Sequence, residues 1–302
     1  MAYTIENLDE RLKNYLDTNN VELLTKTLFN SESAKYFNIQ TGVTAPQPIV
    51  KFDTSISLAD GTACGFEANG SDTFSNRLLE PTFIKVNKEF CPKELLKTWA
   101  HSDVKMNALG QAEAMPFESV ILNANLEAIS VANERLIWEG DKNSEDGNLN
   151  RLNGVITLAK GDEGTIKQTK DSDEVFARCQ QVFLGLNQDI ADKAVIFMSL
   201  ANFRKLIVEL TNKNMYHIFE QHDGTYTMTL AGTNVQIKGV SGIKSDVIIA
   251  TPTENLYLGV DAQNDTDTVD MYFDKSTRTF KMVVEYAYAV QYAYPEYILI
   301  NE

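Results

Sequence analysis

The chain has 302 residues and a mass of 33.8 kDa, and 43% of its residues are hydrophobic, as is usual for a globular protein. Its 27 basic and 42 acidic residues give a formal net charge of −15, which disfavours a protein that grips nucleic-acid phosphates. No apolar run reaches the about 18–20 residues of a membrane-spanning helix, so we expect no membrane insertion.

The termini and the cysteines favour a reducing compartment. Residues 1–20 carry acids and amides where a secretion signal would have a basic patch and an apolar stretch. Cys64, Cys91 and Cys179 are odd in number and lie far apart, which argues against a disulfide framework.

The first part of the chain predicts an arm and a long hairpin. Residues 1–29 place apolar side chains at helical spacing, with an interruption at Asn19-Asn20, and a two-helix arm of this kind must lie on another surface. Residues 51–58 alternate as a strand does, and residues 74–86 form a return strand broken at Pro81. Three glycines mark the region between them: Gly61, Gly65 and Gly70. Such a hairpin is unstable alone, so we expect it to rest on something else; an ordinary surface hairpin is the alternative.

The clearest helix follows. Pro116 opens it and Gly140-Asp141 stops it after Trp138, which gives about 24 residues and a length of about 36 Å at 1.5 Å per residue. Its apolar residues form a wide stripe, so we expect a long helix buried on more than one face.

The middle of the chain alternates short elements. Residues 141–170 are loop-rich around one predicted strand at 155–158, and a helix is expected over 173–186. A buried strand at 194–198 precedes Ser199, which caps a helix over 201–210. Three further strands follow at 226–230, 235–240 and 247–250.

The last third is β. Strands are expected at 255–260 and 268–273, and aromatic or aliphatic side chains then occupy every second position from Phe280 to Tyr294. We interpret this stripe as a sheet face that packs against the long helix. The whole pattern predicts an α+β fold without regular βαβ alternation.

No catalytic, cofactor-binding or metal-ligating residue is predicted. The sequence has no Walker, dinucleotide-binding or H-E-x-x-H motif. Residues 141–147 imitate a calcium loop, but the glycine is one position late and the final glutamate is missing. Cys179 falls inside a predicted helix, where a small core residue is the simpler interpretation. Paired carboxylates remain open, because 42 acids make chance pairs plentiful.

The order of the pieces resembles tailed-bacteriophage major capsid proteins of the Hong Kong 97-like fold. The resemblance covers nearly the whole chain and is strongest over two stretches. The first is 116–141, which ends in Ile137-Trp138-Glu139-Gly140-Asp141. The second is 255–300, with Asn255-Leu256-Tyr257-Leu258-Gly259-Val260-Asp261 and Tyr294-Pro295-Glu296-Tyr297-Ile298. Phe197-Met198-Ser199 before a helix is a weaker third match.

The resemblance implies a domain organisation. Residues 1–45 would be an N-terminal arm, and residues 46–82 an extended β-hairpin, the E-loop, that lies over a neighbouring subunit. Residues 83–160 and 262–302 would form the peripheral P-domain around the long spine helix. Residues 161–261 would form the axial A-domain, near the centre of each pentamer or hexamer.

It also implies subunit contacts. The turn at 274–278 would be the P-loop, where subunits of this family meet at three-fold contacts. The candidate contact residues are Phe66 and Arg77 in the E-loop and Lys275 and Arg278 in the P-loop, with a solvated surface residue as the alternative for each. Some family members crosslink an E-loop lysine to an asparagine of a neighbour, but the P-loop turn has no asparagine to pair with Lys51, so we expect no crosslink.

The function implied is structural. The chain would self-associate as pentamers and hexamers into the icosahedral head that encloses the double-stranded DNA of a tailed phage, in the virion, after assembly in the host cytoplasm. Partners would be portal, scaffolding and decoration proteins, and DNA without sequence-specific contact, which a charge of −15 suits. No long charged helical segment precedes the arm, so scaffolding would be a separate protein or the chain would already be mature.

Three alternatives remain open from the sequence. An encapsulin-like shell has the same fold but carries cargo. An acidic intracellular hydrolase would act on a saccharide through paired carboxylates and would be a monomer or dimer. The third alternative is another virion part, such as a tail tube or a decoration protein. The long helix argues against a tail tube, which is chiefly β.

Overall fold

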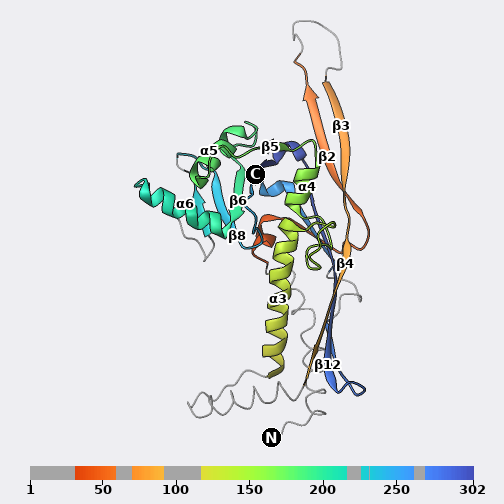
Figure 1. The fold of residues 1–302 in the computed structure, drawn as a ribbon. Helices are drawn as coiled ribbons and strands as arrows, with labels where there is room; N and C mark the ends of the chain where they lie inside the picture. Colours follow the sequence, from red (N-terminus) through yellow and green to blue (C-terminus); the bar gives the residue numbers. More distant parts are fainter. Residues whose placement is uncertain (1–30, 59–69, 92–116, 216–225, 231, 262–268) are drawn as a thin grey trace.

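The computed structural model describes residues 31–58, 70–91, 117–215, 226–230, 232–261 and 269–302. Within them, a five-stranded sheet packs on one long helix, a six-stranded sheet carries two shorter helices, and a two-stranded hairpin projects away from both (Figure 1). The predicted α+β class is confirmed. The predicted arm at 1–29 lies outside the described residues.

The five-stranded sheet is organised by one long strand. Its members are β1 (Asn38–Thr41), β4 (Thr82–Phe90), β10 (Leu256–Asp261), β11 (Val269–Asp274) and β12 (Thr279–Tyr292). β12 pairs antiparallel with β4, β10 and β11, and β1 joins β10 in parallel. The period-2 stripe therefore forms a single 14-residue strand, as its alternation predicts.

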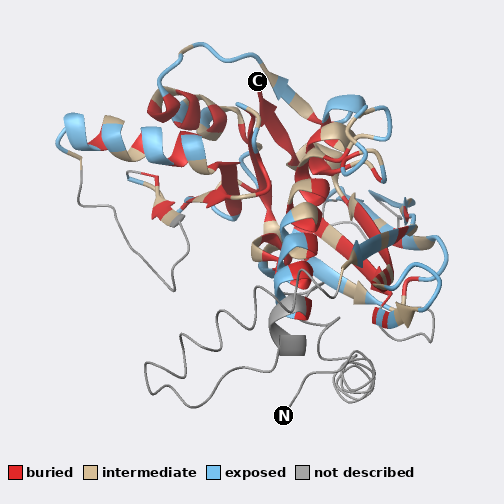
Figure 2. Cartoon of the chain, turned by 60° about the horizontal axis from the view of Figure 1, so that its bottom comes forward, coloured by how far each residue is buried: buried red, intermediate tan, exposed pale blue. Residues whose placement is uncertain are grey.

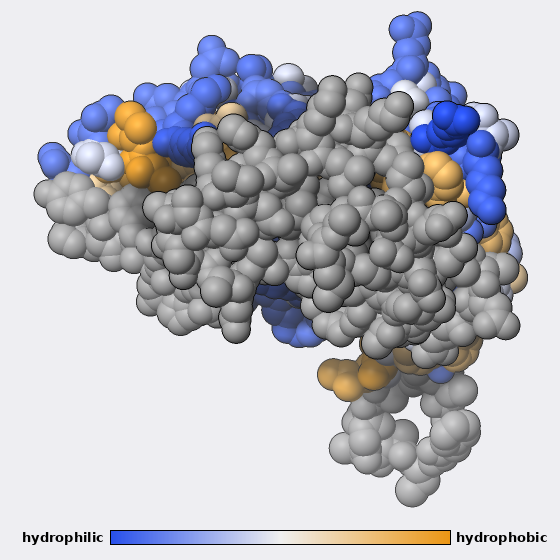
Figure 3. Space-filling model, turned by 90° about the horizontal axis from the view of Figure 1, so that it is seen from below, coloured by the Kyte–Doolittle hydropathy of each residue, from blue (hydrophilic) through white to orange (hydrophobic). Residues whose placement is uncertain are grey.

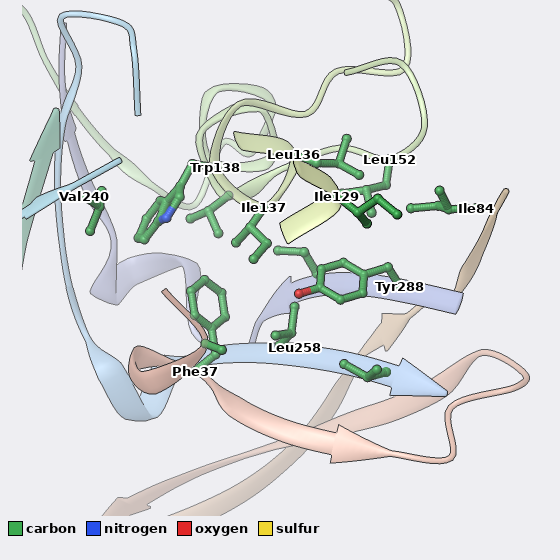
Figure 4. Close-up of a cluster of buried hydrophobic side chains, with 14 of the residues drawn as sticks. Phe37, Ile84, Ile129, Leu136, Ile137, Trp138, Leu152, Val240, Leu258 and Tyr288 are labelled. Atoms are coloured by element: carbon green, nitrogen blue, oxygen red, sulfur yellow. The ribbon is translucent and has the colours of Figure 1, made fainter. Parts of the chain in front are cut away.

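The long helix α3 (Phe117–Glu139) covers one face of this sheet. The even-numbered side chains of β12 point toward it, and the Tyr286 hydroxyl donates a hydrogen bond to Asn133 Oδ1 at 2.6 Å. Trp138 of α3 is fully buried against the residues before β1, and the centroid of its ring lies 5.7 Å from that of Phe37 (Figure 4). The tyrosine-rich strand thus packs against the spine helix, as expected from its spacing.

A buried carboxylate joins residues 31–37 to α3. Glu134 is 3% exposed and accepts hydrogen bonds from the backbone N–H and the hydroxyl of Ser33, in the short 3-10 helix Glu32–Tyr36. Trp138 Nε1 donates to the same hydroxyl at 2.5 Å. Desolvation raises the pKa of Glu134 above its usual value. These bonds fix the start of the described chain on the spine helix.

The second sheet has the strand order β5-β13-β9-β6-β8-β7. The strands are β5 (Ile166–Gln168), β6 (Ala194–Ser199), β7 (Tyr226–Thr229), β8 (Gln236–Val240), β9 (Ile248–Pro252) and β13 (Leu299–Asn301). Every residue of β6 is buried, and α5 (Val175–Gly185) and α6 (Leu200–Asn212) share the core of this sheet. Figure 2 shows the buried residues on the inner sides of the helices and on the strands between them.

Two local predictions for this sheet are confirmed. The Ser199 hydroxyl accepts the backbone N–H of Asn202 at 3.2 Å and so caps α6. Cys179 of α5 is fully buried, and burial raises the pKa of its thiol to about 12, as fits a core residue.

The predicted strand at 155–158 is wrong, because these residues begin the helix α4 (Val155–Gly161). A short run with three apolar residues in four fits a strand and a buried helix equally well. The packing decides, because Val155, Ile156 and Ala159 are buried on one helical face. The break predicted at Pro81 in the return strand at 74–86 is confirmed, and it separates two strands of different sheets: β3 (Gly70–Leu79) belongs to the hairpin, and β4 belongs to the large sheet.

Strand pairing also crosses the boundary predicted at 261/262. β10 lies before that boundary but pairs with β12 in the five-stranded sheet, whereas β13 lies after it and pairs with β5 and β9 in the other sheet. The chain therefore passes between the two sheets three times, after β4, after β9 and after β12, which a division by sequence alone does not anticipate.

An internal arginine ties the last strand to the second sheet. Arg178 is 2% exposed, and its Nε donates to Asn301 Oδ1 at 2.7 Å. Its Nη2 donates to the Asp246 carbonyl oxygen at 2.7 Å, and its Nη1 lies 3.0 Å from Asp246 Oδ1. One side chain on α5 thus holds both β13 and the loop before β9.

Replacement of this arginine is expected to destabilise the fold. Arg178→Ala leaves the buried Asn301 Oδ1 without its donor and removes the contacts with Asp246, so we expect a loss of about 3 kcal/mol in the free energy of unfolding, measured by chemical denaturation. The control is Arg204→Ala, an exposed position on α6, where a change within about 0.5 kcal/mol is expected. Equal effects at the two positions would contradict this role of Arg178.

Candidate assembly surfaces

The hairpin has two chemically different faces. β2 (Gln47–Ile56) and β3 (Gly70–Leu79) pair antiparallel over their full length, with Phe52 opposite Phe74. Because side chains alternate along a strand, the even-numbered residues of both strands share one face and the odd-numbered residues share the other. The odd-numbered face contacts the body of the chain at its base.

A small apolar cluster holds the base of the hairpin. Ile49 and Leu79 are 3% and 0% exposed, and they pack with Val43, Ala289 and Ala293. Gln291 Nε2 also donates to the Leu78 carbonyl oxygen at 3.2 Å. The hairpin is therefore anchored on the outer face of β12, opposite the face that α3 covers.

Two charged contacts reinforce this anchor. Arg77 forms an ion pair with Asp162, and its guanidinium lies 4.4 Å from the centre of the Tyr292 ring. Partial burial acts to raise the pKa of Asp162, but the Gly164 backbone N–H and the Arg77 guanidinium hold it below the usual value. Lys51 Nζ lies 2.5 Å from a carboxylate oxygen of Glu296 on the body.

The even-numbered face of the hairpin is exposed and carries an apolar patch, beside which the Thr54 hydroxyl donates a hydrogen bond to Asp72. The Phe52 and Phe74 rings contact each other with centroids 4.8 Å apart. The apolar face comprises Val50 (64% exposed), Phe52 (46%), Ile56 (77%), Phe74 (71%) and Leu78 (48%). A two-stranded hairpin gains little stability by itself, and an apolar face in water indicates a missing partner.

The predicted contact residues lie in different environments. Phe66 lies outside the described residues. Arg77 is engaged within its own chain, as described above. Lys275 and Arg278 are exposed on the turn between β11 and β12, where Arg278 has a φ of 59°. Asp274 orders this turn by accepting the Ser276 backbone N–H at 2.8 Å. Their role in contacts between subunits stays a prediction.

Sequence reasoning missed the apolar face of the hairpin. The sequence predicts only an alternating strand and a return strand, yet the exposed apolar residues of β2 and β3 fall on one side. The signal was present in the period-2 placement of Val50, Phe52 and Ile56. Only the register of β2 with β3, which places these residues on the same face as Phe74 and Leu78, shows that they form one surface.

Among the described residues, no group of three or more His, Cys, Asp or Glu side chains could hold a metal ion. None of the described helices is long and apolar enough to cross a membrane. On the face seen in Figure 3 the described surface is largely hydrophilic, and hydrophobic side chains gather in separate patches.

The sequence matches no known protein-family model, and no curated protein sequence is significantly similar. Structural similarity is extensive. The chain resembles a protein of the satellite phage P4 procapsid, with a TM-score of 0.65, 14% identity and coverage of 99% of this chain and 98% of the other. It also resembles the capsid of Myoviridae phage XM1, with a TM-score of 0.54, 9% identity and coverage of 88% and 89%.

An encapsulin is similar as well. The SrpI encapsulin of Synechococcus elongatus PCC 7942 has a TM-score of 0.57 and 7% identity, with coverage of 89% of this chain and 85% of the other. The chain thus has the α+β capsid fold over nearly its whole length, which confirms the Hong Kong 97-like fold predicted from the sequence.

Loss of the Arg77 contact is expected to loosen the hairpin without unfolding the body. For Arg77→Ala we expect faster amide hydrogen exchange in β2 and β3, and a fall of about 1 kcal/mol or less in global stability. The control is Lys85→Ala, which removes the ion pair of Lys85 with Glu285 away from the hairpin base. Unchanged exchange in Arg77→Ala would show that the apolar cluster alone holds the hairpin.

The same contact predicts a pH dependence. Because the folded-state pKa of Asp162 is lowered, the ion pair stabilises the hairpin base above the ordinary aspartate pKa and is lost as the pH falls through the lowered value. Exchange in β2 and β3 should therefore accelerate, beyond its intrinsic pH dependence, only in strong acid. In Asp162→Asn this extra acceleration should be absent, and an identical profile in both proteins would contradict the assignment.

Proposed function

We propose that this chain is the major capsid protein of a tailed bacteriophage. Many copies associate as pentamers and hexamers and form the icosahedral head around double-stranded DNA, and the role of the chain is structural rather than catalytic. The observation that supports this most directly is the exposed apolar face of the hairpin, on a chain with a capsid fold. A shell supplies a neighbour to every copy, so every such face is covered.

The proposed domains follow the sheets. The five-stranded sheet with α3, including residues 256–261, forms the peripheral P-domain. The six-stranded sheet with α5 and α6, including residues 299–301, forms the axial A-domain near the centre of each capsomer. The hairpin is the E-loop, and Lys275 and Arg278 lie on the P-loop turn that meets its equivalents at three-fold contacts.

The proposed location is the virion, after assembly in the host cytoplasm. Portal, scaffolding and decoration proteins would be its protein partners. The net charge of −15 supports a shell that encloses DNA without adhering to it.

An encapsulin-like compartment is the second candidate, favoured by the structural similarity to an encapsulin. The contents of purified particles separate the two. Nuclease-resistant DNA inside particles isolated from the native source supports the phage head, whereas a protein cargo without DNA supports the compartment.

Charges on the apolar face are expected to prevent assembly. For Ile56→Asp with Phe74→Asp we expect the monomer fold to persist, because both side chains are exposed in the chain. Each apolar side chain buried between copies contributes about 1.5–3 kcal/mol, so the association constant should fall at least about 100-fold. Light scattering and negative-stain electron microscopy measure the loss of particles.

The matched control places the same charges on the other face. Ser55 and Ser75 are exposed, odd-numbered positions of the same two strands. Ser55→Asp with Ser75→Asp should assemble at nearly the concentration that the unmodified chain needs. If the two double variants assemble equally well, the apolar face is not a subunit contact.

A further inference from the structure

A groove runs along one edge of the five-stranded sheet. It has a volume of about 400 Å³ and lies between α3, β4 and the loop that follows α3. Five consecutive residues of β4, 84–88, line it. Because successive side chains of a strand point to opposite faces, such a lining follows the strand edge rather than one face of the sheet. Among the described strands, β4 pairs only with β12, so its other edge is open.

The open edge is a place where a further strand can be added. An edge strand presents backbone N–H and C=O groups without a neighbouring strand, and an extended segment of another chain can pair with them. The floor beside this edge is apolar, with Ile129 and Leu136 of α3 next to Met282 of β12. Side chains on one face of an added strand would therefore meet an apolar surface.

The groove also contains a hydrogen-bond donor without an acceptor. Asn133 of α3 is 2% exposed and lines the groove. Its Oδ1 accepts the Tyr286 hydroxyl at 2.6 Å, whereas its Nδ2 is buried and has no hydrogen-bond partner among the described residues. A buried donor without an acceptor is unfavourable, so this one favours an occupant that supplies an oxygen.

The groove is cationic in an acidic protein. Lys85, Lys88 and Arg151 line it, and no aspartate or glutamate is among its described lining residues. Lys85 is paired with Glu285 at 2.5 Å. Arg151 is exposed and has no ion-pair partner within the described part of the chain. The groove therefore favours an anionic occupant.

The other two cations lie toward opposite ends of the groove. Lys88 Nζ donates to Asn125 Oδ1 at 2.5 Å, in the first half of α3. The loop that carries Arg151 is held near the other end of the helix, where Asp146 lies 3.3 Å from Nη1 of Arg135. An occupant with acids toward both ends and an apolar middle would match the two cations and the floor between them.

The described strands of a second copy do not match this chemistry. β4 itself has two lysines and one glutamate, so two copies of β4 placed edge to edge repel each other. β2 and β3 each carry one acid and one base and so have no net charge. β11 carries Asp270 and Asp274, but Asp274 is already paired with Lys281 at 2.5 Å. A separate protein with an acidic strand fits the groove better.

We infer that the groove between α3 and β4 binds an extended acidic segment of a separate protein, as an additional strand of the large sheet. The segment pairs with the open edge of β4, and its acids meet Lys88 and Arg151. Its apolar side chains meet the floor, and one of its oxygens accepts a hydrogen bond from Asn133 Nδ2. The inference goes beyond the proposed shell function, because it assigns a binding surface for a second kind of protein.

Peptide binding to the full-length chain tests the site. The probe is a blocked, fluorescent peptide with two glutamates at each end and three valines between them, and its binding is measured by fluorescence anisotropy. Lys88→Glu with Arg151→Glu should weaken binding at least about 10-fold. The control, Arg204→Glu with Lys205→Glu on α6, makes the same change in net charge at exposed positions away from the groove and should change binding less than about 2-fold. Equal effects of the two double variants, or no binding to the unmodified chain, would overturn the inference.

Methylation of the peptide backbone tests whether the probe binds as a strand. A peptide methylated at the backbone nitrogens of its three valines keeps its charges but cannot donate to a strand edge, so its binding should be at least about 10-fold weaker. The unmethylated peptide should also slow amide hydrogen exchange in residues 82–90, measured by mass spectrometry. Equal binding of the two peptides would show that the groove recognises charge alone, and the inference of an added strand would be wrong.

Assembled particles identify the occupant and separate this inference from the proposed function. Particles formed from the full-length chain with the peptide present should retain it, and particles of the Lys88→Glu, Arg151→Glu variant should not. If the free chain binds the peptide but particles of the unmodified chain exclude it, another copy fills the groove, and the inference fails while the shell function stands. If no particles form under any condition, the shell function fails, and peptide binding to the free chain decides the inference alone.

Discussion

An exposed apolar hairpin is the constraint on which the remaining structure depends. β2 and β3 pair along their full length, so the backbone groups that face the partner strand are hydrogen-bonded, but only Ile49 and Leu79 at the base are buried. The outer part of the hairpin presents Phe52, Ile56 and Phe74 to water. An isolated chain cannot correct this, because a two-stranded ribbon has no layer of its own to cover a face. In the shell that we propose, association with other copies covers this face, and the same interaction would drive assembly.

The body of the chain is built to hold that hairpin in one direction. β12 extends through the large sheet with α3 on one face and the hairpin base on the other. Asn255 fixes the point where the chain leaves β12. Its side chain donates to the Tyr294 carbonyl oxygen at 2.8 Å and accepts the backbone N–H of Tyr294 at 2.7 Å. A rigid support of this kind lets one contact specify the angle between neighbouring copies, which a closed shell requires.

The long, strongly periodic elements could be predicted from the sequence. α3 and β12 were expected within one or two residues of their ends, because each carries an unbroken apolar period. Short elements were less certain, and the strand predicted at Val155–Leu158 is a helix, because a segment of four residues is too short to show a helical period. β10 joins the five-stranded sheet and β13 joins the six-stranded sheet through pairing with strands distant in sequence, which the local pattern does not specify. The hairpin's apolar face depends on the register of β2 with β3, which no local pattern specifies.

The most direct measurement is the mass of the full-length chain in solution, alone and co-expressed with its neighbouring genes, together with electron microscopy of the same samples. The account predicts closed shells of at least sixty copies of the 33.8-kDa chain, about 2 MDa, or discrete pentamers and hexamers. A strictly monomeric chain in both conditions, with the hairpin still exposed, would contradict it.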